Sequence, residues 1–258
     1  MKPHLPEIHN QSDDNIRRLF SDISDHYAGH FLESGRGTNH SFRKRLAIAR
    51  KMTRGIRGNL LDVACGPGHI TCAVLEGGGF PRATLVDISP EMLEKARSNV
   101  SRVSDLVEAP NVDFVLANIF DYYDPNETKY DLILVLGLIA HTGRLDDLLG
   151  KLRGMLAPDG VILMQSTLLD HWGTKLVRSL TRKRHYRKFG YWSNYYTLSS
   201  IRDACQRQNL RVQSYERFCT GIPFGDRIGQ RANHWIETRT EKWAVDHGSE
   251  ALFLLKAS

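Results

Sequence analysis

The sequence predicts an α/β fold built on a doubly wound, mostly parallel sheet. Apolar segments of strand length alternate with helical patterns from residue 59 onward, which is typical of a parallel sheet covered by helices on both faces. The first of these strands runs directly into a turn that contains Gly66 and Gly68. The chain has 258 residues, of which 41% are hydrophobic and 25% charged, and this composition fits one globular domain with a full core.

Two helices are predicted ahead of the first strand. Residues 13–31 carry apolar side chains at steps of three and four, the pattern of an amphipathic helix. A glycine-containing loop over residues 34–39 then leads to a basic helix over residues 42–54. We expect residues 1–58 to form an N-terminal helical lid or extension and residues 59–258 to form the main domain.

The main domain is predicted to alternate strands with helices. Ser89 followed by Pro90 is the expected start of one helix, and Thr197 is the expected cap of another. Pro158-Asp159-Gly160 predicts a turn before the fifth strand. The predicted strands are residues 59–64, 83–86, 112–116, 131–137, 161–166, 210–217 and 251–256, and the predicted helices are residues 70–76, 89–100, 145–156, 197–208 and 230–245.

The turn after the first strand predicts a nucleotide-like ligand but not a dinucleotide. Asp62 stands at the strand end, before the glycines, and Thr71 occupies the position where a G-x-G-x-x-G loop would have its third glycine. A carboxylate that points into such a turn suits a cationic ligand better than a pyrophosphate. These residues therefore disfavour a nicotinamide dehydrogenase.

Together with the residues that follow it, segment 59–71 resembles the cofactor loop of class I S-adenosylmethionine-dependent methyltransferases of the small-molecule type. That family usually reads D/E-x-G-x-G-x-G here, and this chain has Ala64 in place of the first glycine and Pro67 between the other two. The resemblance implies a Rossmann-like seven-stranded sheet with an antiparallel last strand. It also implies S-adenosyl-L-methionine as cofactor and S-adenosyl-L-homocysteine as its product.

The resemblance implies a role for residues at three strand ends. Asp62 is expected to act through backbone amides or water on the methionine part of the cofactor. Asp87 ends the second strand, where its carboxylate can accept both ribose hydroxyls. Gly66 and Gly68 are expected to let the backbone approach the ligand, because a Cβ at either position would fill the space that the ligand needs. The alternative for Asp87, capping the next helix, is weaker because Ser89 already supplies a cap.

The adenine is expected between the second and third strands. Ile88 and Met92 are candidates to pack against it, although apolar residues at these positions serve a core equally well. After the third strand, the family commonly has an acid that binds the adenine amino group, and this chain has Asn118. Its side-chain oxygen can still accept that hydrogen bond, with the Ile119 amide donating to the ring, but without the charge we expect a weaker contact.

In the N-terminal segment, Tyr27 and Arg36 are candidates for the methionine carboxylate, and Tyr27 is an equally good core residue. The complete set of predicted cofactor-binding residues is Tyr27, Arg36, Asp62, Ala64, Cys65, Gly66, Gly68, Asp87, Ile88, Met92, Asn118, Ile119, Phe120 and Leu136.

His141 is the candidate catalytic base. It follows the fourth strand, where the methyl group is expected, and an imidazole can take a proton from a hydroxyl acceptor near neutral pH. The alternative is a loop histidine that hydrogen-bonds the backbone. The favoured reaction is in-line O-methylation of a small-molecule acceptor. A sulfonium donor is already activated, so the protein mainly has to position the acceptor.

Residues 168–196 are predicted to form an insertion between the fifth and sixth strands that covers the substrate. Its run of basic and aromatic residues can form a solvated face, hold an anionic small molecule or contact a membrane surface. Nucleic acid is disfavoured, because the segment after the fourth strand lacks the Asn/Asp-Pro-Pro-aromatic pattern of base-methylating relatives. An RNA or DNA methyltransferase and a non-catalytic cofactor-binding protein are the alternative functions.

Composition sets few limits on partners and compartment. The net charge of +6 fits an anionic acceptor, a membrane surface or nucleic acid without choosing among them. The four cysteines are scattered and form no C-x-x-C pair, so we expect a reducing compartment, no disulfide framework and no metal site. No apolar stretch approaches the length of a spanning helix, and a cytoplasmic location is expected. The sequence predicts no oligomeric state.

Overall fold

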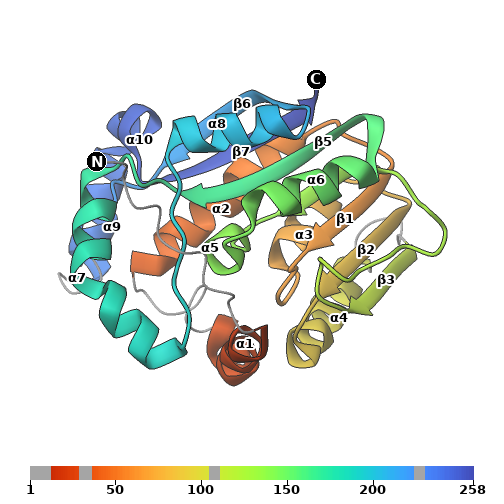
Figure 1. Ribbon diagram of the computed structural model, residues 1–258, viewed down its shortest axis with the longest axis horizontal. Helices are drawn as coiled ribbons and strands as arrows, with labels where there is room; N and C mark the ends of the chain where they lie inside the picture. The colour runs from red at the N-terminus through yellow and green to blue at the C-terminus, as the bar shows by residue number, and fades with distance from the viewer. Residues whose placement is uncertain (1–12, 29–36, 105–110, 224–229) are drawn as a thin grey trace, which may run out of the picture.

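One mixed sheet forms the centre of the computed structural model, which describes residues 13–28, 37–104, 111–223 and 230–258 (Figure 1). Its strand order is β3-β2-β1-β4-β5-β7-β6. The strands are β1 (Asn59–Val63), β2 (Arg82–Asp87), β3 (Asn111–Leu116), β4 (Tyr130–Val135), β5 (Leu156–Thr167), β6 (Leu210–Phe218) and β7 (Glu250–Ala257). The first five pair in parallel, and β7 inserts antiparallel between β5 and β6. The predicted Rossmann-like fold class is confirmed.

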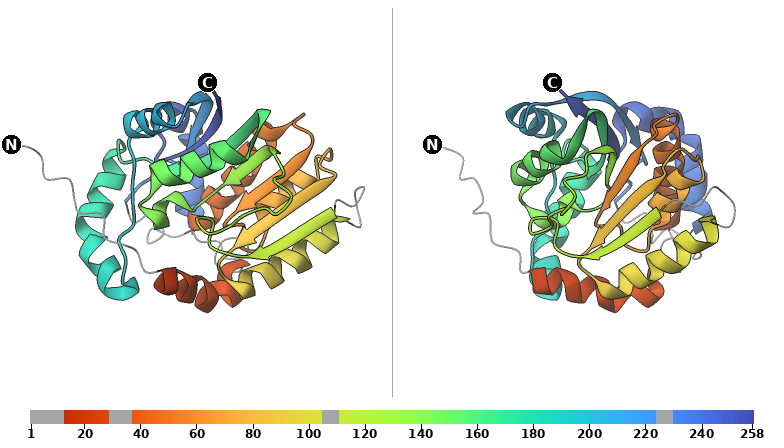
Figure 2. Two further views of the ribbon diagram at one scale, coloured as in Figure 1. Left: turned by 45° about the vertical axis from the view of Figure 1, so that its right-hand side comes forward. Right: turned by 90° about the vertical axis from the view of Figure 1, so that its right-hand side faces the viewer.

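Helices cover both faces of this sheet (Figures 1 and 2). They are α1 (Asp13–Ala28), α2 (Gly37–Thr53), α3 (His69–Leu75), α4 (Pro90–Ser104), α5 (Ile139–Thr142), α6 (Leu145–Met155), α7 (Trp172–Phe189), α8 (Leu198–Arg207), α9 (Gln230–Arg239) and α10 (Glu241–His247). Successive side chains of each central strand point to opposite faces of the sheet. Leu61 and Val63 join the core formed with α6 and α8, whereas Leu60 joins the core formed with α2, α3 and α4.

The strand order reverses between β1 and β4, and this reversal positions the site. From β1 the chain crosses to β2 and then β3 on one side, and it returns to β4 and β5 on the other. In an open parallel sheet the loops on the two sides of such a point diverge and leave a crevice at the carboxyl ends of the strands. The residues expected to bind the cofactor follow β1, β2, β3 and β4, so they meet at this crevice.

Two helices from distant parts of the sequence lie at the carboxyl ends of the strands. α1 packs against α4, where Ser21 donates a hydrogen bond to Glu91, and it crosses the lower edge of the molecule in Figures 1 and 2. α7 contacts α1 and lies between β5 and β6 in the sequence, as predicted for the insertion. α2, by contrast, buries Ile48 and Ala49 in the core. The proposed division of the chain at residue 58 stays a prediction.

Three local predictions are wrong. Residues 37–39 are not part of a loop, because α2 begins at Gly37. The predicted turn at residues 158–160 is a bulge within β5, where Gly160 approaches the Tyr130 carbonyl so closely that a Cβ would lie 2.6 Å from its oxygen. The single helix expected over residues 230–245 is divided into α9 and α10 at Thr240. The short helix α5 was not predicted.

Candidate functional site

The turn from β1 to α3 uses backbone conformations that favour glycine. Ala64, Gly66 and Gly68 have φ angles of 56°, 54° and 75°, all in the left-handed region. Ala64 takes this conformation where the family usually has glycine, so the substitution keeps the shape of the turn. The turn is attached to β2, because the Cys65 amide donates to the Val86 carbonyl and the Gly66 amide donates to Asp87 Oδ2 at 2.8 Å.

The surroundings of Gly66 and Gly68 favour glycine for different reasons. A Cβ on Gly66 would have no atom within 4 Å, and Gly66 lines a cavity, so the space beside this position is open. A Cβ on Gly68 would lie 3.2 Å from Ala96 Cβ on α4. Gly68 therefore has a packing reason to be glycine in its contact with α4, and its predicted role beside the ligand stays a prediction.

Asp87 lies in the crevice at the end of β2. Its side chain is 6% exposed and accepts hydrogen bonds from the Gly66 and Ser89 amides at 2.8 and 2.9 Å. Burial raises the pKa of this carboxyl, and the amide hydrogen bonds oppose that effect. Asp87 lines both of the cavities described below, and its position fits the predicted contact with a ribose.

Asp62 lies beneath the turn. It is 3% exposed, accepts a hydrogen bond from the Thr71 hydroxyl, and lines neither of these cavities. Burial raises its pKa to about 7, while the Thr71 hydrogen bond lowers it and the charge of Asp87 raises it. Thr71, which argued against a dinucleotide loop, is thus the residue that fixes Asp62. Cys65 is also buried outside both cavities, and burial holds the pKa of its thiol well above the usual range.

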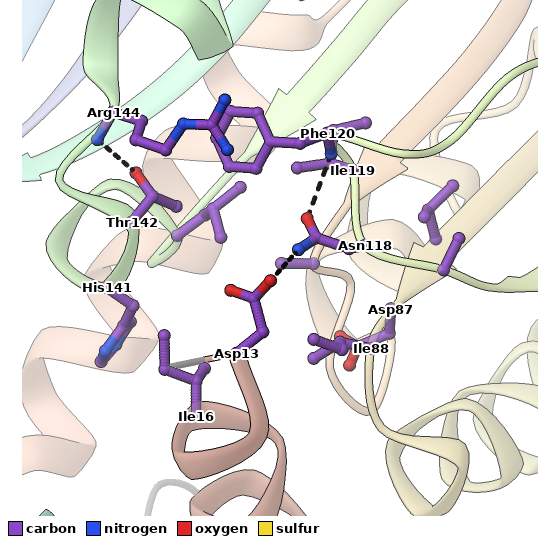
Figure 3. Close-up of a pocket in the computed structure, with 14 residues that line it drawn as sticks. Asp13, Ile16, Asp87, Ile88, Asn118, Ile119, Phe120, His141, Thr142 and Arg144 are labelled. Carbon is purple, nitrogen blue, oxygen red and sulfur yellow. Dashed lines mark hydrogen bonds between the residues drawn. The ribbon is translucent and has the colours of Figure 1, made fainter. Parts of the chain in front are cut away.

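Two adjoining cavities fill the crevice and share six residues. The first lies beside β2 and β3 (Figure 3), and the second lies beside β4 and β5. Their shared lining residues are Ile16, Ala64, Asp87, Ile88, Leu138 and His141. Asn118, Ile119 and Phe120 line only the first, whereas Gly66, Met92 and Leu136 line only the second.

Asp13, an acid that was not predicted to belong to the site, lines the first cavity. Asn118 Nδ2 donates to Asp13 Oδ2 of α1 at 2.6 Å, and Asn118 Oδ1 accepts from the Phe120 amide at 3.1 Å (Figure 3). The guanidinium of Arg144 lies 3.9 Å from the centre of the Phe120 ring. A carboxylate is therefore present beside Asn118, in the region where the family has an acid after the third strand. It comes from a residue 105 positions earlier in the chain.

His141 lies in α5 and faces both cavities. Its Nδ1 is 2.9 Å from the Tyr191 hydroxyl, and its ring makes an edge contact with Phe20 at 5.2 Å between centroids. Burial lowers the pKa of His141 to about 4, and the charge of His185 adds to the effect. The ring is consequently neutral at pH 7, as a base requires, but its affinity for a proton is weak.

Arg45, Gln165 and Thr167 line the second cavity and were not identified from the sequence. Gln165 and Thr167 lie at the end of β5, where the inward alternation of the strand was a usable signal. For Arg45 there was no such signal in the sequence, because its helix contains several other basic residues. Of the two N-terminal candidates, Tyr27 belongs to α1 but its side chain lies outside the described residues, as does the whole of Arg36.

Across the part of the chain that the structure describes, no helix combines the length and apolar character needed to cross a bilayer. Nor do the described His, Cys, Asp and Glu side chains form a group of three or more that could hold a metal ion.

The fold and the crevice define an α/β protein with two cavities at the carboxyl ends of its parallel strands. Residues 25–215 match a family model described as a methyltransferase domain. The chain therefore belongs to this methyltransferase-domain family, and the resemblance found in the sequence is confirmed.

Similar curated proteins are named as methyltransferases. A malonyl-(acyl-carrier protein) O-methyltransferase from Halalkalibacterium halodurans is 30% identical over 151 residues, which cover 53% of each chain. A trans-aconitate 2-methyltransferase from Methylobacterium radiotolerans is 33% identical over 107 residues, covering 41% of this chain and 36% of the relative. The chain thus spans about half, or less, of the length of these relatives.

Solved structures show the same fold at low sequence identity. Magnesium protoporphyrin IX methyltransferase from Synechocystis PCC 6803, solved with bound S-adenosylhomocysteine, aligns with a TM-score of 0.65 at 13% identity and covers 94% of this chain and 98% of its own. The DhpI complex with S-adenosylhomocysteine aligns with a TM-score of 0.61 at 14% identity, covering 95% and 96%.

Proposed function

We propose that this protein binds S-adenosyl-L-methionine and catalyses transfer of its methyl group to an oxygen of a small-molecule acceptor. The observation that carries the proposal is the pair of adjoining cavities, which extend from Asp87 at the end of β2 to Gln165 at the end of β5. One side has the features that a nucleoside needs, and the other leaves room for an acceptor. Bound S-adenosylmethionine would supply a methyl group already activated by its sulfonium charge.

The residues of the first cavity fit the nucleoside. Asp87 presents a carboxylate to the ribose, and Gly66 leaves an open cradle beside the turn. Ile88 and Leu138 supply apolar surfaces for the adenine ring. Asp13 adds an acceptor for the adenine amino group next to Asn118. In this assignment α1, which belongs to the predicted N-terminal lid or extension, takes part in cofactor binding.

What the protein has to do in the second cavity depends on whether the acceptor oxygen belongs to a hydroxyl or to a carboxylate. A hydroxyl acceptor must lose a proton, and His141 is the candidate base predicted for that step. A carboxylate acceptor is already ionised and needs only to be placed in line with the methyl group. Both are O-methylations, and the same labelling experiment separates them.

The decisive experiment incubates the protein with methyl-labelled S-adenosylmethionine and a fractionated metabolite extract, followed by mass analysis of the labelled product. We expect label in small molecules. Tight binding of S-adenosylhomocysteine with no transfer to any fraction would instead identify a non-catalytic cofactor-binding protein. Label in RNA or DNA, with affinity that falls steeply as salt is added, would identify a nucleic-acid methyltransferase.

The side chains on the surface of α7 are relevant to two alternative partners, nucleic acid and a membrane surface. Tyr191 is buried and so is not presented to bases, whereas Tyr186, which stacks on Trp192 at 4.4 Å between ring centroids, is 44% exposed. The outer stripe of Trp172, Leu176 and Leu180 is exposed, and the helix has seven Lys or Arg residues and no acid. We propose that this stripe contacts anionic membranes peripherally. Sedimentation with phosphatidylglycerol vesicles, but not with phosphatidylcholine vesicles, is the expected result.

A further inference from the structure

Two buried polar atoms at the acceptor end of the second cavity have no hydrogen-bond partner. One is Gln165 Oε1 and the other is Arg45 Nε. Buried polar groups of folded proteins are nearly always paired with protein, water or ligand. One acceptor and one donor without partners in the same cavity therefore indicate a ligand that offers both a donor and an acceptor.

The orientation of Gln165 is fixed by its neighbour. The side chain is 5% exposed, and its Nε2 donates to Glu250 Oε2 at 2.6 Å. The reversed amide would place oxygen against oxygen, so Oε1 has to be the unpaired atom. Thr167 donates to the other oxygen of Glu250 at 2.7 Å. Glu250 is thus held by two donors, and the free atom of Gln165 requires an O–H or N–H group from a ligand.

Arg45 supplies a cation on the acceptor side. Its guanidinium lies 5.7 Å from the centre of the Phe42 ring, and no ion pair involving it is found among the described residues. Arg45 also lies close enough to the thiol of Cys219, just beyond β6, to affect its pKa. Burial raises this pKa most, the charges of Glu237 and Glu250 raise it further, and the Ser41 hydrogen bond and the charge of Arg45 lower it. Arg45 therefore lies toward β6 and β7, across β4 and β5 from the ribose acid Asp87.

The tautomer of His141 makes this residue a hydrogen-bond donor and not a base, which favours a reaction that needs no base. Tyr191 is 1% exposed, and within the described ranges its hydroxyl has one hydrogen-bond partner, His141 Nδ1. A buried phenol proton without an acceptor would be costly, so the hydroxyl donates to Nδ1 and the ring hydrogen is on Nε2. His141 then offers a hydrogen-bond donor to the cavity. Apart from the ribose acid Asp87, the residues around this cavity include no other side chain suited to accept a proton.

We propose that the acceptor is a small carboxylate that also carries an O–H or N–H group, that Arg45 binds its carboxylate, and that Gln165 accepts the O–H or N–H hydrogen. This inference rests on the proposed methyltransferase function. A carboxylate oxygen attacks the methyl carbon, a C–O bond forms, and the C–S bond breaks with its electron pair passing to sulfur. The sulfonium becomes a neutral thioether and the product is a methyl ester. No proton is transferred, which agrees with a histidine that donates.

The test uses the full chain, methyl-labelled S-adenosylmethionine and a metabolite extract separated by anion exchange. We expect label in compounds of the retained, acidic fraction, and we expect mild alkali to release it as methanol, as for a methyl ester. Label in the neutral or cationic fraction, or label that resists alkali, overturns the carboxylate inference and leaves the methyltransferase proposal standing. No transfer to any fraction contradicts both.

Variants of Arg45 test its assignment with the acidic fraction as the probe. Arg45→Gln should lower the rate at limiting acceptor at least thirtyfold while changing S-adenosylhomocysteine affinity less than twofold, and Arg45→Lys should recover part of the loss. Arg43→Gln, an exposed position on the same helix, is the matched control and should leave both unchanged. An unaltered rate in Arg45→Gln overturns the assignment. So does a parallel loss of S-adenosylhomocysteine affinity, since Arg45 would then bind the carboxylate of the cofactor.

Discussion

Replacing Asp87 with asparagine tests the ribose contact with little change in side-chain volume. The carboxylate can accept from both ribose hydroxyls while its two oxygens also hold the Gly66 and Ser89 amides. Hydrogen bonds to a charged acceptor contribute about 1.5–3 kcal/mol, against about 0.5–1.5 kcal/mol for neutral ones. Losing the charge from two such bonds should cost about 2–3 kcal/mol, so the dissociation constant of S-adenosylhomocysteine should rise about 30- to 150-fold.

Isothermal titration calorimetry measures this change, and two comparisons keep it interpretable. Asp159→Asn changes a side chain that is 97% exposed and should bind like the original protein. 5′-Methylthioadenosine lacks the amino-acid tail, so Asp87→Asn should weaken it by the same factor as S-adenosylhomocysteine. If affinity for both ligands stays within threefold while the variant remains folded, Asp87 does not bind the ribose.

Four further outcomes follow from the site. His141→Asn keeps an N–H donor and should retain turnover within about tenfold, whereas a loss of 100-fold or more is typical of a removed general base and would contradict the donor role. Gly68→Ala should lower the melting temperature, because left-handed strain and overpacking should cost about 2–4 kcal/mol of stability. Gly66→Ala should cost only about 1–2 kcal/mol of stability but should weaken the binding of S-adenosylhomocysteine. Equal losses of stability and of affinity in the two variants would refute the different roles of these glycines. Asp62 has a pKa of about 7 when folded and 3.8 in the unfolded chain, so its contribution to stability is complete below pH 3.8 and is lost as the pH rises through 7. Asp62→Asn should therefore stabilise the protein more at pH 8 than at pH 5, by up to about 3 kcal/mol in denaturant titrations, and a pH-independent effect would count against a buried, protonated Asp62. Asp13→Ala should weaken S-adenosylhomocysteine several-fold but leave S-inosylhomocysteine, which lacks the amino group, unaffected; equal losses for both ligands would exclude the contact.

The parts of the site that the sequence predicted are those encoded locally. Asp87 ends a strand whose apolar residues are easily recognised, and the parallel arrangement brings every strand end to one edge. Gly66 needed only the turn motif. These features depend on a few neighbouring residues, which explains why the fold class and the position of the crevice were also predictable.

The parts that were not predicted depend on contacts between distant segments. Gly68 is required by Ala96 on α4, and Asp13 reaches Asn118 only because α1 packs across the strand ends. Arg45 is one of several basic residues on α2, and only the packing of α2 onto the sheet shows that it faces the second cavity. The hydrogen bond between Tyr191 and His141 joins residues 50 positions apart. Packing selects these partners, and the local pattern contains no trace of them.

A structure of the protein with S-adenosylhomocysteine tests the central claim most directly. The account predicts both ribose hydroxyls within hydrogen-bond distance of Asp87, the sulfur near Gly137, and a free volume between the sulfur and Arg45. A nucleoside bound elsewhere, or a homocysteine carboxylate paired with Arg45, would contradict it.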